Sequence, residues 1–132
     1  MTPAAWSTDE LDRIGAADEL RIAARRRDGS LRRPIPIWVV RVDDDLFVRS
    51  WRGAGGGWYR TARETHEAHI SAGGVERDIS LTEAESGVDD AVDAAYRAKY
   101  GRYSSYVEPM IAAQARATTL NLVPRGEPGR GG

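Results

Sequence analysis

The alternation of apolar and polar residues along the chain predicts five short strands. Apolar side chains recur at every second position in residues 19–27 and 75–83, which is the period of a strand with one buried face. Pro34 and Pro36 confine the start of another strand to a sheet edge or a bulge, because proline donates no ladder hydrogen bond. The predicted strands are residues 19–27, 30–42, 46–51, 75–83 and 118–123.

Two helices are predicted from their termini and their apolar stripes. Ser7 and Glu10 have the spacing of a capping box, in which two backbone N–H groups are satisfied reciprocally, and Gly15 ends this helix. A second helix begins at Ser86 or Asp89 and runs to about residue 100. Its expected inward face consists of Val88, Ala91, Val92, Ala95 and Ala98.

A further helix is expected at residues 61–72, because Gly73 and Gly74 provide a suitable C-cap. This segment carries His66 and His69, which are the two histidines of the chain. Two ligands do not make a metal site, and the sequence offers no evident third ligand nearby. We therefore interpret the segment as a surface helix and expect no metal.

The order of these elements predicts the fold class. The strand–helix–strand alternation of a doubly wound nucleotide fold is absent, so we expect an α+β fold with a small barrel or curled antiparallel sheet. A chain of 132 residues favours a single domain, which we place at residues 1–123. Residues 124–132 are rich in glycine and proline and are expected to form a disordered tail.

Composition excludes several functions. The formal net charge is −1, which disfavours nucleic acid as a partner, although ten arginines face four aspartates between Arg21 and Arg60. The chain has no cysteine, so disulfides, thiolate chemistry and cysteine-ligated metals are excluded. No apolar run approaches the ~20 residues of a membrane helix, and the N-terminus lacks the features of a secretory signal. A cytoplasmic protein is therefore expected.

The strongest candidate for ligand binding is a basic hairpin. Asp28 and Gly29 form a typical two-residue hairpin turn. The register that this turn imposes places four residues on one face of the hairpin: Arg25, Arg27, Ser30 and Arg32. One interpretation is a phosphate clamp, because a bound anion would relieve the repulsion between the arginines. The other is a solvated loop whose arginines point into water or pair with the acidic turn at 43–45.

Two further segments are candidates for the same ligand. Ser50 ends a strand and precedes a loop with four glycines between 53 and 57, where a hydroxyl and backbone N–H groups could hold a phosphate or a ring carbonyl. Trp58 and Tyr59 follow directly and could form the wall of a flat pocket. The plainer interpretations are a strand end with a long loop, and a pair of core aromatics. No catalytic residue can be named, since no complete nucleophile–base–carboxylate set is evident.

The order of these features resembles the flavin- and deazaflavin-binding split β-barrel superfamily, and looks most like its small deazaflavin-dependent nitroreductase-like branch. The order, within residues 25–72, is a basic hairpin, a P-x-P-x-W strand, a polar turn, VRS-x-x-G, a glycine run and WYR before a helix. Over nearly its whole length, including YRAKYGRY and TTLNLVPR, the chain also resembles a family of uncharacterised bacterial proteins of about this size.

This resemblance implies an antiparallel six-stranded split β-barrel with flanking helices, in which a flavin or deazaflavin ring lies in a groove, often at a dimer interface. The phosphate would lie beside Arg27, Ser30, Arg32 and Arg33. The ring or the ribityl chain would lie along Ser50, Arg52 and Gly53, and Trp58 and Tyr59 would lie near the cofactor and the substrate mouth. Where the relatives have a G-R-K-S-G-like turn, this chain has RDGSL, which brings Asp28 close to the expected phosphate.

Two functions follow from the resemblance. One is an oxidoreductase that uses FMN or a deazaflavin coenzyme on a small organic substrate, with the hydride chemistry supplied by the bound ring. The alternative is a non-catalytic ligand-binding or structural dimeric protein that keeps the same barrel, because a fold does not fix a function. A homodimer is expected in both cases.

Overall fold

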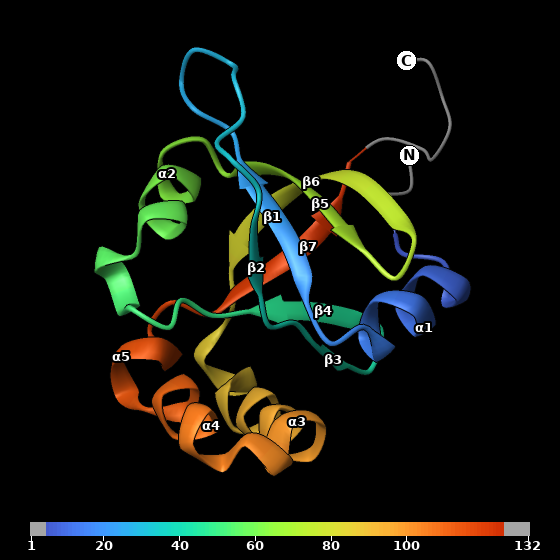
Figure 1. Ribbon diagram of the computed structural model, residues 1–132, viewed down its shortest axis with the longest axis vertical. Coiled ribbons are helices and arrows are strands. Elements are labelled where there is room, and N and C mark those ends of the chain that lie inside the picture. Colours follow the sequence, from blue (N-terminus) through green and yellow to red (C-terminus); the bar gives the residue numbers. More distant parts are fainter. Residues whose placement is uncertain (1–4, 126–132) are drawn as a thin grey trace.

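Seven antiparallel strands form one curled sheet in the computed structural model, which describes residues 5–125 (Figure 1). The strand order across the sheet is β2-β1-β5-β6-β7-β4-β3. The strands are β1 (Leu20–Ala24), β2 (Ile35–Ile37), β3 (Val40–Val42), β4 (Asp45–Val48), β5 (Glu67–Ala72), β6 (Val75–Glu83) and β7 (Leu120–Pro124). The α+β class and the curled antiparallel sheet are confirmed, whereas the expected six strands are seven.

The helices lie on the outside of the sheet. Figure 1 shows α1 and α2 on opposite flanks and α3, α4 and α5 as a separate layer beside β3 and β4. Their bounds are α1 (Thr8–Ala16), α2 (Gly57–Thr65), α3 (Asp89–Tyr100), α4 (Ser104–Ile111) and α5 (Ala113–Arg116), with short 3-10 turns η1 (Gly53–Gly55), η2 (Ser86–Val88) and η3 (Gly101–Tyr103). Among the residues described, none of these helices combines the length and the apolarity needed to cross a bilayer.

The two edges of the sheet meet at a two-residue corner. Trp38 and Val39 alone separate β2, at one edge, from β3, at the other, so the sheet must curl until its edges approach each other. The predicted strand 30–42 is therefore broken in two. The corner is fixed to α3, because the carbonyl oxygen of Val39 accepts a 2.7 Å hydrogen bond from Lys99 and its N–H donates to the Tyr100 hydroxyl at 3.3 Å.

The predicted capping box is present at the start of α1. The N–H of Glu10 donates to the Ser7 hydroxyl at 3.0 Å, and the N–H of Ser7 donates to the Glu10 carboxylate at 2.9 Å. Leu11 and Ile14 turn the apolar stripe of this helix into the core. Glu10 also receives a hydrogen bond from the largely buried Arg77 of β6 at 2.7 Å, which attaches the helix to the sheet.

The predicted helix at 61–72 is correct only for residues 61–65, because the chain leaves α2 at His66 and enters β5. His66 has the left-handed φ of 59° and its N–H caps the helix on the carbonyl of Ala62. The alternation in β5 buries Ala68, Ile70 and Ala72, and because two of these three are alanine the signal in the sequence is weak. Gly73 and Gly74, expected to cap a helix, instead form the β5–β6 hairpin with φ angles of 57° and 85°, as a tight turn of this kind requires.

This correction also moves His69 from a helix surface to a strand. Its ring lies between the carboxylates of Asp78, 3.0 Å from Nδ1, and Glu76, 3.1 Å from Nε2. Burial opposes protonation of the imidazole, but the hydrogen bonds to these two carboxylates outweigh it and raise the pKa of His69. The interpretation as part of a surface helix is therefore wrong for His69, whereas His66 is the exposed C-cap of α2.

The inward face of α3 also differs from the expectation. Ala91 and Ala98 are exposed, and the buried residues are Val92, Asp93, Tyr96 and Tyr100. Apolarity alone ranks alanine above aspartate for burial. The ranking fails here because Asp93 meets a buried arginine, Arg49, at the end of β4.

The tip of the basic hairpin is wider than a two-residue turn. Arg25 pairs with Leu31, and the N–H of Arg26 donates to the carbonyl of Ser30 at 2.7 Å, so the predicted register at the tip is wrong by one residue. Asp28 explains the difference. Its carboxylate accepts hydrogen bonds from both the N–H (2.9 Å) and the hydroxyl (2.6 Å) of Ser30, and this side-chain turn replaces the expected two-residue turn.

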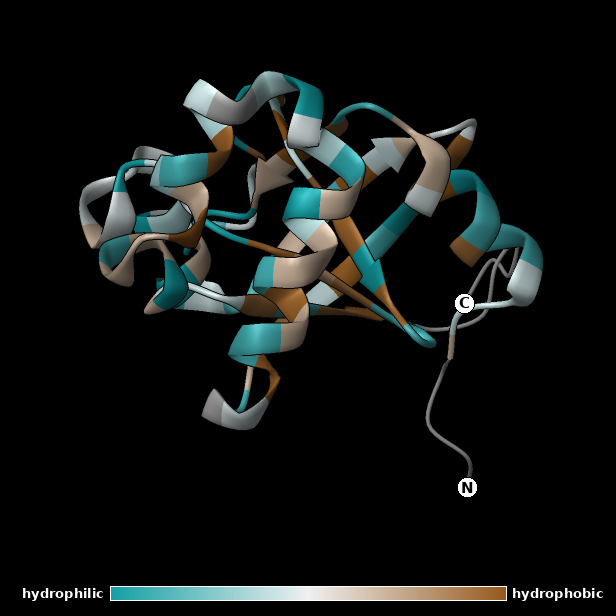
Figure 2. Cartoon of the chain, turned by 90° about the horizontal axis from the view of Figure 1, so that it is seen from below, coloured by the Kyte–Doolittle hydropathy of each residue, from teal (hydrophilic) through white to brown (hydrophobic). Residues whose placement is uncertain are grey.

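Two apolar clusters hold the fold together. The larger one fills the curl of the sheet and includes Ile22, Ile70 and Leu122, and the smaller one lies between β3–β4 and the helical layer and includes Phe47 and Tyr96. Figure 2 shows hydrophobic residues gathered along the interior strands and hydrophilic ones on the outer helical turns. The sheet is thus anchored on both faces.

The last strand extends to the start of the predicted tail. Pro124 is buried and pairs with Ile79, and the N–H of Arg125 donates to the carbonyl of Asp78 at 3.0 Å. The rest of the predicted tail, residues 126–132, lies outside the described residues.

Candidate functional site

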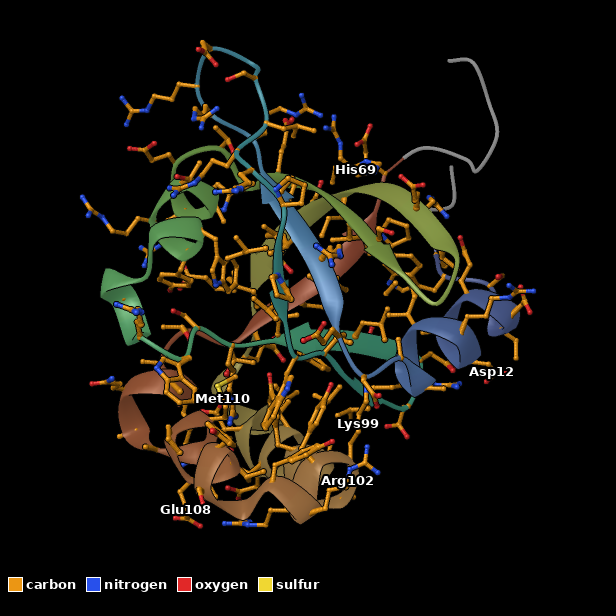
Figure 3. The ribbon with its side chains drawn as sticks, in the orientation of Figure 1. Asp12, His69, Lys99, Arg102, Glu108 and Met110 are labelled. Atoms are coloured by element: carbon orange, nitrogen blue, oxygen red, sulfur yellow. The ribbon has the colours of Figure 1, made fainter. Side chains whose placement is uncertain are left out.

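A cavity of about 570 Å³ opens between the edge of the sheet and the helical layer. Its walls come from six places in the chain: Glu19 before β1, Arg32 after the hairpin, β2 with the corner residue Trp38, residues 49–52 after β4, residues 56–58 at the start of α2, and Tyr106 with Met110 on α4. Figure 3 shows Met110 at the junction of the helical layer and the sheet. This volume lies within the range of ligand sites, roughly 300–1,000 Å³.

Aromatic rings form much of the cavity wall. Trp38, Trp51, Trp58 and Tyr106 all line it. Trp58 is only 8% exposed, whereas Trp51 and Tyr106 are 48% and 55% exposed and face each other with ring centres 5.9 Å apart. Flat apolar surfaces of this kind stack well on a planar ligand.

Arg32 and Arg52 supply positive charge to the same cavity. Arg32 Nη1 donates to the carbonyl of Gly57 and to the hydroxyl of Thr61, both at 2.9 Å. A Cβ at Gly57 would lie 3.1 Å from Arg32 Nη2, so glycine allows the guanidinium to lie against the start of α2. Arg52 is exposed and, among the residues that the structure describes, forms no ion pair.

Ser50 fixes the start of the glycine-rich loop through a buried hydrogen bond. Its buried hydroxyl donates to the carbonyl of Gly53 at 2.7 Å, and its N–H donates to the Thr118 hydroxyl at 2.8 Å. A Cβ at Gly56 would lie 2.5 Å from the Ser50 oxygen, so the backbone can pack this closely only without a side chain. Gly53 adopts a φ of 65° and is buried against the side chain of Gln114.

The structure brings together four of the nine site residues expected from the sequence: Arg32, Ser50, Arg52 and Trp58 line the cavity. The other five do not line it. Gly53 is buried at the start of the loop against Gln114, and Tyr59 is 3% exposed in the core, with its ring edge against Trp58. The remaining three, Arg27, Ser30 and Arg33, belong to the hairpin tip and the segment after it.

The side chains of the hairpin tip already form hydrogen bonds with each other and an ion pair with α2. Arg27 is exposed and lies 3.7 Å from the Glu64 carboxylate. The Ser30 hydroxyl donates to Asp28 and accepts a 3.2 Å hydrogen bond from Arg26. Arg33 is exposed to solvent. The part of the predicted clamp that adjoins the cavity is therefore Arg32.

Sequence reasoning missed Arg49, which lines the cavity and is fully buried. Its guanidinium donates to Asp93, to the Thr119 hydroxyl at 2.8 Å and to the carbonyl of Met110 at 2.9 Å. The available signal was an arginine at the end of an apolar strand combined with an acidic helix start. Tyr106 and Met110 were missed because no element had been predicted between residues 102 and 117.

The donors and surfaces of the cavity suit a flat anionic ligand. The guanidinium groups of Arg32 and Arg52 and the N-terminal backbone of α2 favour negative charge, whereas Arg49 is already paired with Asp93. The indole rings favour a planar ring system. Glu19 is the one carboxylate among the described lining residues, which include no histidine or lysine. The chain by itself therefore offers binding groups more than acid–base groups.

Three solved structures with similar folds set the chain among known proteins. A FAD-binding protein from Mesorhizobium loti shares 15% identity at a TM-score of 0.58 and is matched over 96% of this chain and 95% of its own. An F420-H2 dependent reductase shares 13% identity at a TM-score of 0.61, over 80% and 93%. The heme storage protein HutZ from Vibrio cholerae shares 11% identity at a TM-score of 0.63, over 91% of both chains. At these identities the likeness establishes a shared fold.

The sequence itself matches one family. A search of curated proteins finds no match. The model of a family described as uncharacterised proteins conserved in bacteria, DUF2255, matches residues 10–122, which includes the hairpin, the cavity-lining segments and the start of the last strand. The chain therefore belongs to the DUF2255 family.

Proposed function

We propose that the cavity binds a flavin-type cofactor, FMN or a deazaflavin coenzyme, and that the protein is an oxidoreductase acting on a small organic substrate. The observation that carries the proposal is the meeting of tryptophan rings with the guanidinium groups of Arg32 and Arg52 in one cavity of about 570 Å³. The FAD-binding and F420-dependent proteins of the same fold support it by analogy.

The cofactor phosphate is assigned to the side of the cavity where Arg32 lies. The Arg32 guanidinium is already held by hydrogen bonds to Gly57 and Thr61, so its side chain loses little conformational entropy when it binds an anion. The exposed Arg52 lies on the wall of the same cavity and provides a second charge. The tricyclic ring is assigned to the aromatic surface of Trp58 and its neighbours.

In the proposed reaction the cofactor and the chain have separate roles. The bound ring supplies hydride transfer, and the chain binds it, orients it and shields one of its faces from water. This division suits a cavity whose lining, among the described residues, contains a single carboxylate, Glu19. A homodimer, expected from the resemblance, stays a prediction that the mass in solution would test.

The proposal is tested by titrating the protein with FMN and with a deazaflavin coenzyme while tryptophan fluorescence is followed. We expect quenching at micromolar concentrations of at least one of them, because three tryptophans line the cavity. Riboflavin, which lacks the phosphate, should bind more weakly than FMN. The absence of quenching by either cofactor would contradict the proposal.

Two neighbouring arginines provide a matched pair of variants. Arg32→Ala should weaken FMN binding by about 1–3 kcal/mol through the loss of a charge-assisted hydrogen bond, and should leave riboflavin binding nearly unchanged. Arg33→Ala removes the same charge from an exposed position outside the cavity and should leave both affinities unchanged. Equal effects of the two substitutions would remove Arg32 from the phosphate site.

A non-catalytic ligand-binding protein is the second candidate. The scarcity of acid–base groups in the cavity favours it, and a heme storage protein shares the fold. The two candidates differ in a direct measurement. An oxidoreductase that holds the reduced cofactor transfers its hydride to a suitable acceptor, whereas a binding protein leaves the rate of cofactor reoxidation unchanged across a panel of quinones and nitroaromatics.

A further inference from the structure

A second hollow adjoins the proposed cofactor cavity on the side of the helical layer. It has a volume of about 670 Å³ and is lined by Asp18, Glu19, Trp38, Tyr100, Tyr103 and Tyr106. Trp38, Tyr106 and Glu19 line both spaces, so the two are neighbours across a shared wall. Its lining is thus entirely aromatic rings and carboxylates.

The aromatic wall of this hollow is well ordered by packing. Trp38 stacks on Tyr100 with ring centres 3.9 Å apart and an interplanar angle of 1°, and Tyr103 lies 6.2 Å away from Trp38. The Tyr100 hydroxyl donates to the carbonyl of Asp18 at 2.8 Å and is therefore occupied. The ring faces of the wall are available to a ligand, and ring faces carry negative electrostatic potential.

The rim already binds a cation in this manner. The Arg102 guanidinium lies 5.0 Å from the centre of the Tyr103 ring and 3.6 Å from the Asp18 carboxylate. Figure 3 shows Arg102 and Lys99 at the same end of the helical layer. A positive group held between a ring face and a carboxylate is the arrangement that recognises organic ammonium ions.

Glu19 is the carboxylate of the hollow that has no cationic partner among the described residues. It lines both spaces, is exposed and, within residues 5–125, takes part in no ion pair. The nearby Lys99 is directed elsewhere, since its ammonium donates to the carbonyl of Val39 at 2.7 Å and lies 5.0 Å from the centre of the Tyr100 ring. One carboxylate charge beside Trp38 and Tyr106 is therefore not neutralised by a direct partner.

We propose that this hollow is a subsite for an organic cation, an alkylated amine or ammonium compound, whose positive group lies between the Glu19 carboxylate and the ring faces of Trp38 and Tyr106. The shared wall would place such a ligand next to the proposed cofactor. We further propose that this ligand is the substrate, a statement that rests on the proposed function. Binding of the cation requires no cofactor.

The test uses choline and its neutral isostere 3,3-dimethyl-1-butanol as probes of the cofactor-free protein. The probe is titrated while the indole N–H resonance of Trp38, assigned with Trp38→Phe, is followed by NMR. We expect choline to shift this resonance and to bind about tenfold more tightly than the neutral alcohol, in line with the strength of a cation–π contact plus a carboxylate. Equal affinities for the two probes, or no shift with either, would overturn the proposal.

Charge-neutralising variants then locate the site. Glu19→Gln should weaken choline binding several-fold without changing the affinity for the alcohol. Glu108→Gln is the matched control, because Glu108 is exposed on α4, lines neither space and points away from the sheet in Figure 3. A loss of choline binding in both variants would indicate attraction by overall charge and would overturn the assignment to Glu19.

A ring substitution provides an independent readout. Tyr106→Leu should weaken choline binding, and Tyr106→Phe should retain it, because the ring face and not the hydroxyl contacts the cation. Tyr106 is 55% exposed, so both variants should fold. If the protein binds choline but neither flavin nor deazaflavin, the proposed function fails while the cation site stands.

Discussion

Replacement of the buried arginine Arg49 offers the sharpest test of how the helical layer is attached to the sheet. Its side chain is fully buried, and it contacts Asp93, Asp89, Thr119 and the carbonyl of Met110. Arg49→Met leaves the Asp93 carboxylate, only 12% exposed, with Arg116 at 3.4 Å as a partner. Breaking one side of a buried ion pair costs about 3–5 kcal/mol.

The cost arises because the buried Asp93 carboxylate loses its nearest cation and keeps only the more distant Arg116. A domain of this size has a free energy of unfolding of about 5–15 kcal/mol, so the substitution removes a large part of it. The double variant Arg49→Met/Asp93→Leu removes both charges, and we expect it to be more stable than Arg49→Met alone. Part of the loss should persist, because the Met110 carbonyl is left without its donor.

The assay is urea unfolding followed by tryptophan fluorescence and by circular dichroism, with the m-value checked for constancy. Arg41→Met is the control. Arg41 lies on the neighbouring strand β3 and pairs with Asp12 at 2.8 Å near the surface, where an ion pair contributes about 0–1 kcal/mol. A cost below about 1 kcal/mol for Arg49→Met would refute the reasoning. So would a loss of stability in the double variant equal to the sum of the losses from Arg49→Met alone and Asp93→Leu alone.

Two further predictions concern the loop and the corner. Gly56→Ala should destabilise the protein measurably in the same unfolding assay, since its Cβ would lie 2.5 Å from the Ser50 hydroxyl oxygen, whereas Gly55→Ala has open space and should be nearly neutral. Burial lowers the pKa of Lys99 to about 8, opposed by Asp18, so the folded state loses a proton before the unfolded state does and stability should rise as the pH increases from about 8 towards 10. Lys99→Met should abolish that rise in a series of denaturation midpoints, and an unchanged pH profile would contradict the assignment.

Local signals in the sequence were sufficient for several elements. The capping box of Ser7 and Glu10, the strand β6 and the strand β7 were predicted because their causes are short-range: side chains that satisfy helix ends and alternation that exposes one face. The edge position of Pro36 in β2 follows from its missing N–H in the same way.

Other local signals were ambiguous. Gly73 and Gly74 suit a helix C-cap and a tight hairpin equally well, and the choice between them was made by the pairing of β5 with both β1 and β6. Asp28 widened the basic hairpin through hydrogen bonds to Ser30 that no pattern of apolar residues encodes. In both cases tertiary or side-chain contacts selected one of several conformations that the residues allow.

The sequence by itself determined the fold class, most strands and the chemistry available to a ligand: arginine, tryptophan and glycine concentrated in one stretch of the chain. The tertiary structure decided which of those residues meet. Arg32 and Trp58 share a cavity because the sheet curls at Trp38 and the helical layer closes against it, whereas Arg27 is carried to the hairpin tip. A pocket is a property of long-range packing, and packing depends on contacts between residues far apart in the chain.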